Sequence, residues 1–271
     1  MTRAVPVLMY HHVSPQPGLV TVSPEIFEEH MAYLARKKYR ALAADELLEF
    51  LQGKRALDGR QVLITFDDGY LDNYVYAYPL LKRYGLKATI FAITGLIGDG
   101  VARAHLGADK ILPATPDHRA CKAAIAAGRA DEVMLRWSEI EAMQASGALE
   151  IHSHTHTHQR WDQLHADKNQ RLAALQKDLT ASQAALTTRL GKASQHLCWP
   201  WGYFETEYQT IAAQLGFSAQ YATAKGINTV GADTRQIPRI VMKEKPAAWL
   251  GTRLWIYSHP LAGRLYSRWR K

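Results

Sequence analysis

Two histidines just after a short apolar run have the spacing of metal ligands. Residues 150–158 read EIHSHTHTH, and His154 and His158 are four positions apart. Side chains at that spacing face the same side of a helix, so we expect one helical turn to bring both imidazoles to one ion. A catalytic metal ion commonly takes three protein ligands and keeps a further position open. The third ligand should therefore be a carboxylate elsewhere in the chain.

Two adjacent carboxylates are the candidates for that third ligand. Asp67 and Asp68 follow directly on a predicted strand at residues 61–66. Neighbouring carboxylates at the end of a buried strand cost desolvation and repel each other unless a cation or a proton separates their roles. A histidine tract alone would also fit a loosely metal-binding surface. The carboxylates and the histidines together indicate a site.

The composition limits the number of domains, the kind of partner and the cellular compartment that we expect. The chain has 271 residues, enough for one barrel-sized domain or two small ones, and 47% of them are hydrophobic. The net charge of +8 favours an anionic partner or surface. The cysteines, Cys121 and Cys198, lie far apart and favour a reducing compartment over a disulfide framework. The apolar run at the amino terminus is too short for a signal peptide and no stretch has the length of a membrane span, so we expect a cytoplasmic protein.

The elements that must position these residues alternate between strand and helix. Strands are predicted at residues 5–10, 40–43, 61–66, 88–93, 149–152, 195–199, 218–223 and 236–241. Helices are predicted from Ser23 onward and at residues 44–51, 74–84, 119–127, 138–147, 168–190 and 206–215. This alternation is typical of a parallel α/β sheet or barrel. Without a linker or repeat, residues 1–271 should form one domain, with an irregular excursion at 95–130 and a basic aromatic tail at 249–271.

The ends of four predicted strands carry the residues that can do chemistry. They are followed by His11 and His12, by Asp67 and Asp68, by the histidines of residues 154–158 and by the WPWG run of residues 199–202. In a parallel barrel, functional residues gather at the carboxyl ends of the strands, so these groups should face one cleft. The reaction class that they indicate is metal-assisted hydrolysis.

Three runs of residues also resemble the successive motifs of a known family. Residues 65–69 (TFDDG), 154–158 (HTHTH) and 199–203 (WPWGY) are similar to those of the polysaccharide deacetylase family (carbohydrate esterase family 4, NodB homology domain). The resemblance extends from Val7 to about Val241. It implies a single distorted (β/α)7-type barrel with parallel strands that removes N-acetyl groups from amino sugars with a divalent metal ion. We expect Zn²⁺ and leave Co²⁺, Ni²⁺ and Fe²⁺ open.

The resemblance also implies roles for individual residues. Asp68, His154 and His158 would be the metal ligands, and Asp67 would be the general base. The backbone N–H of Trp201 would stabilise the oxyanion of the tetrahedral intermediate. His156, which lies between the two histidine ligands, should point away from the ion. His152 takes a position that is usually small, and we interpret it as a supporting histidine rather than a fourth ligand.

The sequence departs from the common family pattern in its general acid and in the partner of its base. A late Leu-x-x-His-type motif is missing, since His259 lies in the basic tail that we expect to be irregular. The opening residues 7–12 (VLMYHH) instead resemble the permuted poly-N-acetylglucosamine deacetylase branch, which implies His11 as the general acid and leaves His12 as the alternative. The Arg that usually accompanies the Pro-Tyr-Gly motif is absent here, so we expect Arg239 to orient the base.

The tail at residues 249–271 is rich in Trp, Tyr and Arg, which is the composition of a segment that lies on an anionic membrane. The alternative is that the tail packs across the barrel and displays a basic face. Contact with a membrane would make a lipid-linked N-acetylated sugar the substrate, deacetylated at the inner face of the membrane.

Three other kinds of function fit parts of the sequence. The nearest are a deformylase and a deacetylase of a small nucleotide-linked amino sugar. An Fe(II) oxygenase normally has a carboxylate two residues from its first histidine ligand, and the sequence has none there. The third alternative is a basic, non-catalytic module that binds an anion. No predicted helix carries a dense Lys/Arg stripe, so a nucleic acid partner is not expected.

Overall fold

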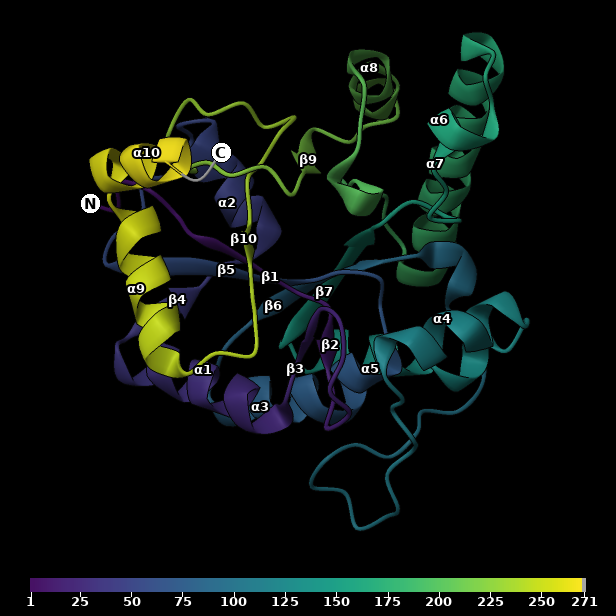
Figure 1. Ribbon diagram of the computed structural model, residues 1–271, viewed down its shortest axis with the longest axis horizontal. Coiled ribbons are helices and arrows are strands. Elements are labelled where there is room, and N and C mark those ends of the chain that lie inside the picture. The colour runs from purple at the N-terminus through teal and green to yellow at the C-terminus, as the bar shows by residue number, and fades with distance from the viewer. Residues whose placement is uncertain (270–271) are drawn as a thin grey trace.

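The fold is built on one parallel sheet. The computed structural model describes residues 1–269 (Figure 1), so Arg270 and Lys271 of the predicted tail lie outside the described residues. The sheet has eight strands. They are β1 (Val7–Tyr10), β4 (Tyr39–Ala41), β5 (Arg60–Phe66), β6 (Ala88–Ala92), β7 (Leu149–Ser153), β8 (His196–Cys198), β9 (Ala219–Tyr221) and β10 (Ile240–Val241). Each lies within two residues of its predicted range except β10, which is shorter at its start.

The sheet curls into the expected distorted barrel. Its strands follow the order β10-β1-β5-β6-β7-β8-β9, and β4 pairs with β5 off this path. All of these pairs are parallel. A parallel bridge between Tyr221 at the end of β9 and Ile237, just before β10, joins the two edges of the sheet. The prediction of a seven-stranded parallel barrel is therefore confirmed.

The register of the strands aligns their carboxyl ends. Tyr10 of β1 pairs with Phe66 of β5, and Phe66 pairs with Ile90 of β6. On the other side of β6, Ala92 pairs with Ser153 of β7. The residues that follow β1, β5 and β7 therefore emerge at the same end of the barrel.

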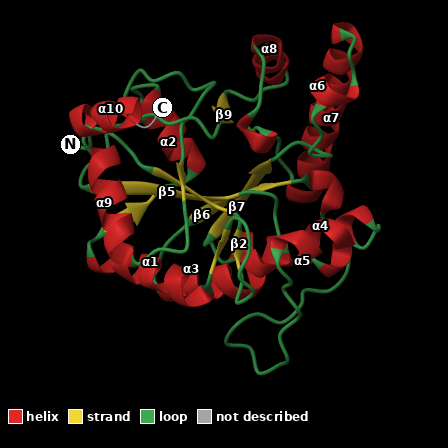
Figure 2. Cartoon of the chain, viewed as in Figure 1, coloured by secondary structure: helices red, strands yellow, loops and turns green. Residues whose placement is uncertain are grey.

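Helices surround the sheet, whose strands run through the middle of the molecule (Figure 2). They are α1 (Pro24–Arg36), α2 (Ala44–Leu51), α3 (Tyr78–Arg83), α4 (His118–Ala126), α5 (Trp137–Ala145), α6 (Trp161–Leu164), α7 (Lys168–Leu190), α8 (Thr206–Gln214), α9 (Ala247–Ser258) and α10 (Pro260–Trp269). Their ends follow local chemistry. Ser23 caps α1 by accepting a hydrogen bond from the N–H of Ile26, and Gly191 ends α7 in a left-handed conformation with φ 74°.

Apolar faces fix how the helices lie on the barrel. Phe27, Met31 and Leu34 form the predicted face of α1 and are completely buried. On α7 the predicted leucine stripe is buried at Leu175, Leu179 and Leu186, which confirms it as core. Fully burying one such side chain contributes about 1.5–3 kcal/mol to folding. These contacts hold the helices that carry the site.

Two predicted helices differ in detail. The segment predicted as one helix at 74–84 opens with a π-helical turn, Asn73–Ala77, before α3. The predicted capping box at 138–141 does not start α5, which begins at Trp137. Ser138 donates its hydroxyl proton to the carbonyl of Gly100 instead of capping the helix, and Glu139 accepts the N–H of Arg136. Ser138 lies inside the first turn of α5, so it cannot be the N-cap residue.

The carboxyl-terminal tail is helical, so the prediction of an irregular tail was wrong. Leu250 and Leu254 are completely buried on α9, which packs against α1 and the barrel. This is the packing alternative, and it holds for the first half of the tail. In α10, Leu261 and Leu265 are exposed by 79% and 60%. Among the described residues, no helix combines the length and apolar character needed to cross a bilayer.

Candidate active site

Except for Arg239, which is buried behind Asp67, the predicted site residues line one cavity at the carboxyl end of the barrel. Its volume is about 480 Å³. His11 follows β1, Asp67 and Asp68 follow β5, and His154 and His158 follow β7. The structure therefore brings together residues that are up to 147 positions apart in the sequence, the distance from His11 to His158.

Asp68, His154 and His158 converge on one point. Asp68 Oδ1 lies 3.3 Å from His154 Nε2 and 3.5 Å from His158 Nε2. The three ligand atoms all lie within 4.8 Å of one another. A tetrahedral ion with bonds of about 2 Å holds its ligands about 3.3 Å apart, so this spacing fits a divalent metal ion.

The two histidine ligands do not lie on a helix, so the predicted helical turn was wrong. β7 ends at Ser153, and the chain then forms an irregular turn in which Thr155 has φ 65° and His158 has φ 56°. The N–H of His158 donates to Thr155 Oγ1 over 3.0 Å. Left-handed residues in the middle of the run exclude a helix and aim both imidazoles at Asp68.

The ring of His154 is held in the tautomer that a metal ligand needs. Its Nδ1 donates to the carbonyl of Cys198 over 2.8 Å, so Nε2 is the nitrogen that faces Asp68 and would bind the ion. His156 turns away from the site as predicted, and its Nδ1 pairs with Thr94 Oγ1 at 3.0 Å. His152 Nδ1 pairs with Ser194 Oγ at 2.8 Å, and His152 belongs to no group of converging ligand atoms among the described residues.

Asp67 and Arg239 form a buried, bidentate ion pair. The two nitrogens of the guanidinium lie 2.6 and 2.8 Å from the two carboxylate oxygens, and both side chains are almost completely buried. Burial alone would raise the pKa of Asp67, but the charge and hydrogen bonds of Arg239 outweigh it and hold that pKa below its usual value. The expected partner of Asp67 is thus in place, and the carboxylate is ionised at neutral pH.

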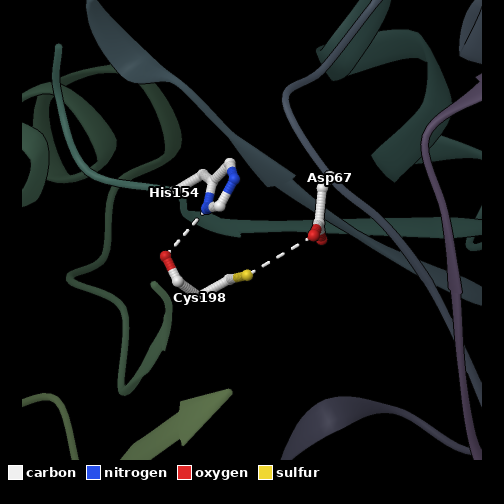
Figure 3. Close-up of side chains that lie close together, drawn as sticks. All are labelled: Asp67, His154 and Cys198. Atoms are coloured by element: carbon white, nitrogen blue, oxygen red, sulfur yellow. Dashed lines mark hydrogen bonds between the residues drawn. The ribbon is translucent and has the colours of Figure 1, made fainter. Parts of the chain in front are cut away.

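A second group of possible ligands lies beside the first. Asp67, His154 and Cys198 also bring ligand atoms within 4.8 Å (Figure 3). However, Arg239 already holds Asp67 and donates to Cys198 Sγ over 3.0 Å, so a cation would meet a buried positive charge there. Burial also raises the pKa of the Cys198 thiol, which opposes the thiolate that a metal needs. The group with Asp68 is the better metal site.

The structure distinguishes the two histidines that follow β1. His11 lines the cavity, and its Nε2 lies 3.8 Å from Asp67 Oδ2. Burial lowers the pKa of His11, although the carboxylates of Asp67 and Asp68 act in the opposite direction. His12 is completely buried behind the wall of the cavity. Only His11 of this pair can therefore reach a molecule in the cavity.

Trp201 lies at the rim of the cavity in the turn Pro200–Gly202. Its φ of 55° is unusual for a bulky residue, and Asp68 and His158 also have positive φ. Each such residue costs about 1–2 kcal/mol, which the surrounding structure must offset. The indole is half exposed, and its ring lies 4.2 Å from that of His158.

Known families and proteins resemble this chain in sequence and in fold. The family model for polysaccharide deacetylase matches residues 54–220. The chain belongs to the polysaccharide deacetylase family. The match includes both carboxylates and the histidine run, and it ends before Arg239.

Relatives and solved structures cover different parts of this deacetylase-family chain. YxkH of Bacillus subtilis is 47% identical over 94 residues, which span 35% of the chain and only 33% of YxkH. A poly-β-1,6-N-acetyl-D-glucosamine N-deacetylase of Staphylococcus aureus is 25% identical over 83% of the chain and 68% of its own length. The structure of IcaB from Ammonifex degensii matches with a TM-score of 0.71 at 24% identity and covers 93% of this chain and 97% of that one. A de-N-acetylase of Aggregatibacter actinomycetemcomitans matches with a TM-score of 0.72 at 23% identity and covers 92% of this chain and 98% of that one, so the fold is shared.

Asp178 of α7 supports the metal-binding turn and was missed by the sequence analysis. It accepts the N–H of His156 over 3.1 Å and the hydroxyl proton of Thr157 over 2.6 Å. Its side chain is buried between Leu175 and Leu179 on the apolar face of α7. A carboxylate inside an apolar stripe is the signal that could have identified it, because a buried charge needs partners.

We expect Gly202→Ala to destabilise the protein and displace the turn that carries Trp201. Gly202 has φ 67°, and an added Cβ would lie 2.8 Å from the backbone nitrogen of Thr223. The control is Gly191→Ala, which has a similar φ of 74° but open space around the added atom. Urea unfolding should show Gly202→Ala losing about 1–3 kcal/mol more than this control. Equal losses would contradict the tight approach.

Proposed function

We propose that this chain is a metal-dependent hydrolase that removes N-acetyl groups from an amino sugar in a polysaccharide or a lipid-linked glycan. The observation that carries the proposal is that the two adjacent carboxylates have different partners. Asp68 joins two imidazoles in a metal-binding group, while Asp67 is ionised and held by Arg239. The names of the staphylococcal and Aggregatibacter proteins, which are N-deacetylases, support the same reaction.

Asp68, His154 and His158 would hold the metal ion. A set of two imidazoles and one carboxylate suits Zn²⁺, and Co²⁺, Ni²⁺ or Fe²⁺ would also accept it. When bound, the ion would polarise the acetamide carbonyl and make the attacking water more acidic. The carbonyl of Cys198 orients the ring of His154 for this task.

Asp67 acts as the general base. It takes the proton from the attacking water, and the bidentate contact with Arg239 keeps the carboxylate ionised and oriented. The proton then reaches the leaving nitrogen through His11, whose Nε2 lies 3.8 Å from Asp67 Oδ2. Because burial lowers the pKa of His11, this histidine is neutral in the resting site and can receive that proton. The products are acetate and the free amine of the sugar.

Trp201 contributes through its backbone. Its N–H lies in a left-handed turn at the rim of the cavity and would donate to the oxygen of the tetrahedral intermediate. One such donor is worth about 2.7–4 kcal/mol of transition-state stabilisation. The strained conformation of the turn fixes that donor before the substrate arrives.

Acetate release tests the function and the base together. Zinc-loaded protein should release acetate from at least one of a β-1,6-linked N-acetylglucosamine pentasaccharide, a chitopentaose, a UDP-N-acetyl sugar and a lipid-linked N-acetyl sugar. Asp67→Asn should lower kcat by about 10²–10⁴-fold and retain zinc, because it removes the base and keeps the ligands. The matched variant Asp68→Asn should lose the metal. An active Asp67→Asn protein would contradict the base, and no acetate from any compound would contradict the function.

We expect Arg239→Met to shift the acidic limb of the pH profile of kcat/KM. The guanidinium lowers the pKa of Asp67, so its removal raises that pKa. The base would then become protonated at a higher pH, and activity would be lost at least about one pH unit earlier on acidification. Arg235→Met is the control, since Arg235 is exposed and pairs with Asp233. An unchanged acidic limb would show that Arg239 does not control the base.

We further propose that α10 contacts an anionic membrane at its inner, cytoplasmic face and that the substrate is lipid-linked. Leu261 and Leu265 project from α10 and are largely exposed, and Trp255 of α9 is exposed by 58%. Basic residues such as Arg264 accompany them, which suits a surface of acidic headgroups. Free, buried cysteines are compatible with a reducing compartment.

Sedimentation with lipid vesicles tests this membrane contact. The protein should bind phosphatidylglycerol vesicles more strongly than phosphatidylcholine vesicles, and added salt should weaken the binding. The double substitution Leu261→Glu and Leu265→Glu should remove most of it. Ile111→Glu is the control, because Ile111 is 96% exposed and belongs to the excursion at 95–130 instead of the tail. Equal binding by all three proteins would contradict the role of α10.

A further inference from the structure

A chain of hydrogen-bonded side chains runs through the wall of the cavity and takes no part in the chemistry described above. His12 Nδ1 lies 2.6 Å from Asp72 Oδ2, and His12 Nε2 lies 3.1 Å from His118 Nδ1. His12 and Asp72 are almost completely buried. The His12 ring stacks on that of Tyr70, with their centroids 3.8 Å apart. The packing therefore holds this series of hydrogen bonds in one arrangement.

Asp72 determines which nitrogens of the chain carry protons. Its Oδ1 accepts the N–H of Val13 over 3.2 Å and the side-chain amide of Asn73 over 2.8 Å, so the group acts as an acceptor throughout. His12 Nδ1 must therefore be the donor to Asp72. When the His12 ring carries only this proton, its other nitrogen, Nε2, is an acceptor, and His118 Nδ1 donates to it. The remaining nitrogen, His118 Nε2, is left as an acceptor.

His118 lines the substrate cavity, and its Nε2 lies on the side of the ring away from the contact of Nδ1 with His12. It begins α4, the helix of the excursion at 95–130, and lines the cavity together with Lys122 and Ile125 of the same helix. The described part of the chain offers no hydrogen-bond partner for its Nε2. Burial lowers the pKa of His118, which favours the neutral ring.

We propose that His118 is a positioning residue for the substrate, and that its Nε2 accepts a hydrogen bond from a hydroxyl group of the bound amino sugar. Asp72 sets this preference through His12. The excursion at 95–130 thereby supplies part of the wall of the cavity that contacts the sugar. The inference rests on the proposed function, since it assumes a hydroxyl-bearing substrate in this cavity.

The substitution Asp72→Asn reverses the chain of donors. The oxygen of the introduced amide would stay with the N–H of Val13 and the side chain of Asn73, so the NH₂ group of that amide would face His12 Nδ1. His12 would then carry its proton on Nε2 and donate to His118 Nδ1. His118 Nε2 would become a donor, in competition with the sugar hydroxyl instead of complementary to it.

Histidine tautomers can be measured without any substrate. Long-range ¹H–¹⁵N NMR of the zinc-loaded protein should show His118 with its proton on Nδ1, and the Asp72→Asn protein should show the proton on Nε2. A wild-type His118 that is protonated on Nε2, or on both nitrogens at neutral pH, would overturn the proposal. This outcome is independent of whether the protein releases acetate.

Kinetics with the β-1,6-linked N-acetylglucosamine pentasaccharide test the contact itself. His118→Ala should raise KM about five- to tenfold, the effect of one hydrogen bond, with kcat within about threefold and zinc content unchanged. Asp72→Asn should raise KM similarly, and the double variant should be no worse than His118→Ala, because both act on one contact. The control is Arg119→Ala, an exposed neighbour on α4.

The outcomes separate this inference from the proposed function. An unchanged KM in His118→Ala, or additive effects in the double variant, would overturn the role of His118 while leaving the deacetylase intact. If the wild-type protein releases no acetate from any compound of the panel, the proposed function fails, and the NMR result alone decides whether Asp72 fixes the tautomer of His118.

Discussion

The ion pair between Asp67 and Arg239 is the interaction on which the site depends. Two carboxylates that follow one another at the end of a buried strand repel, and neither would stay ionised there without compensation. Arg239 compensates the charge of Asp67 with two hydrogen bonds. At Asp68, the two imidazoles of His154 and His158 complete a group that could bind a cation. In the proposed function, one carboxylate then takes part in proton transfer and the other in metal binding.

The barrel makes this separation possible. Parallel register brings the ends of β1, β5 and β7 to one level, so His11, Asp67 and His154 meet although they are distant in the sequence. Arg239 reaches Asp67 because the segment that closes the barrel, from Ile237 into β10, lies next to β1 and β9. The closure of the barrel therefore also completes the site.

The identities of the site residues could be predicted from the sequence, but the backbone conformation around them could not. Asp68 and His154 could be predicted because they follow strand ends and have the chemistry of metal ligands. Arg239 was inferred from the resemblance, because the arginine that usually accompanies the Pro-Tyr-Gly motif is absent. The turn from Ser153 to His158 could not be, since positive φ at Thr155 has no marker in a non-glycine residue. The spacing of four was read as a helix, but the same spacing serves a turn equally well.

The fold could be predicted because most segments of the sequence show the hydrophobic periodicity of a strand or of a helix. The excursion at 95–130 has no such periodicity, so the short helix predicted there had no assigned function. Its contacts are long-range, such as that of His118 with His12, and no local pattern encodes them. The same is true of Asp178, whose partners lie more than 20 positions away.

The most direct test of this account is X-ray absorption spectroscopy of the zinc-loaded protein. We expect one equivalent of zinc with only nitrogen and oxygen ligands, at about 2.0–2.2 Å, and with the scattering of histidine rings. This result would place the ion at Asp68, His154 and His158 and leave Asp67 to act as the base. A sulfur ligand at about 2.3 Å would instead place the ion at Cys198, beside Asp67, and would contradict the separation of the two carboxylates.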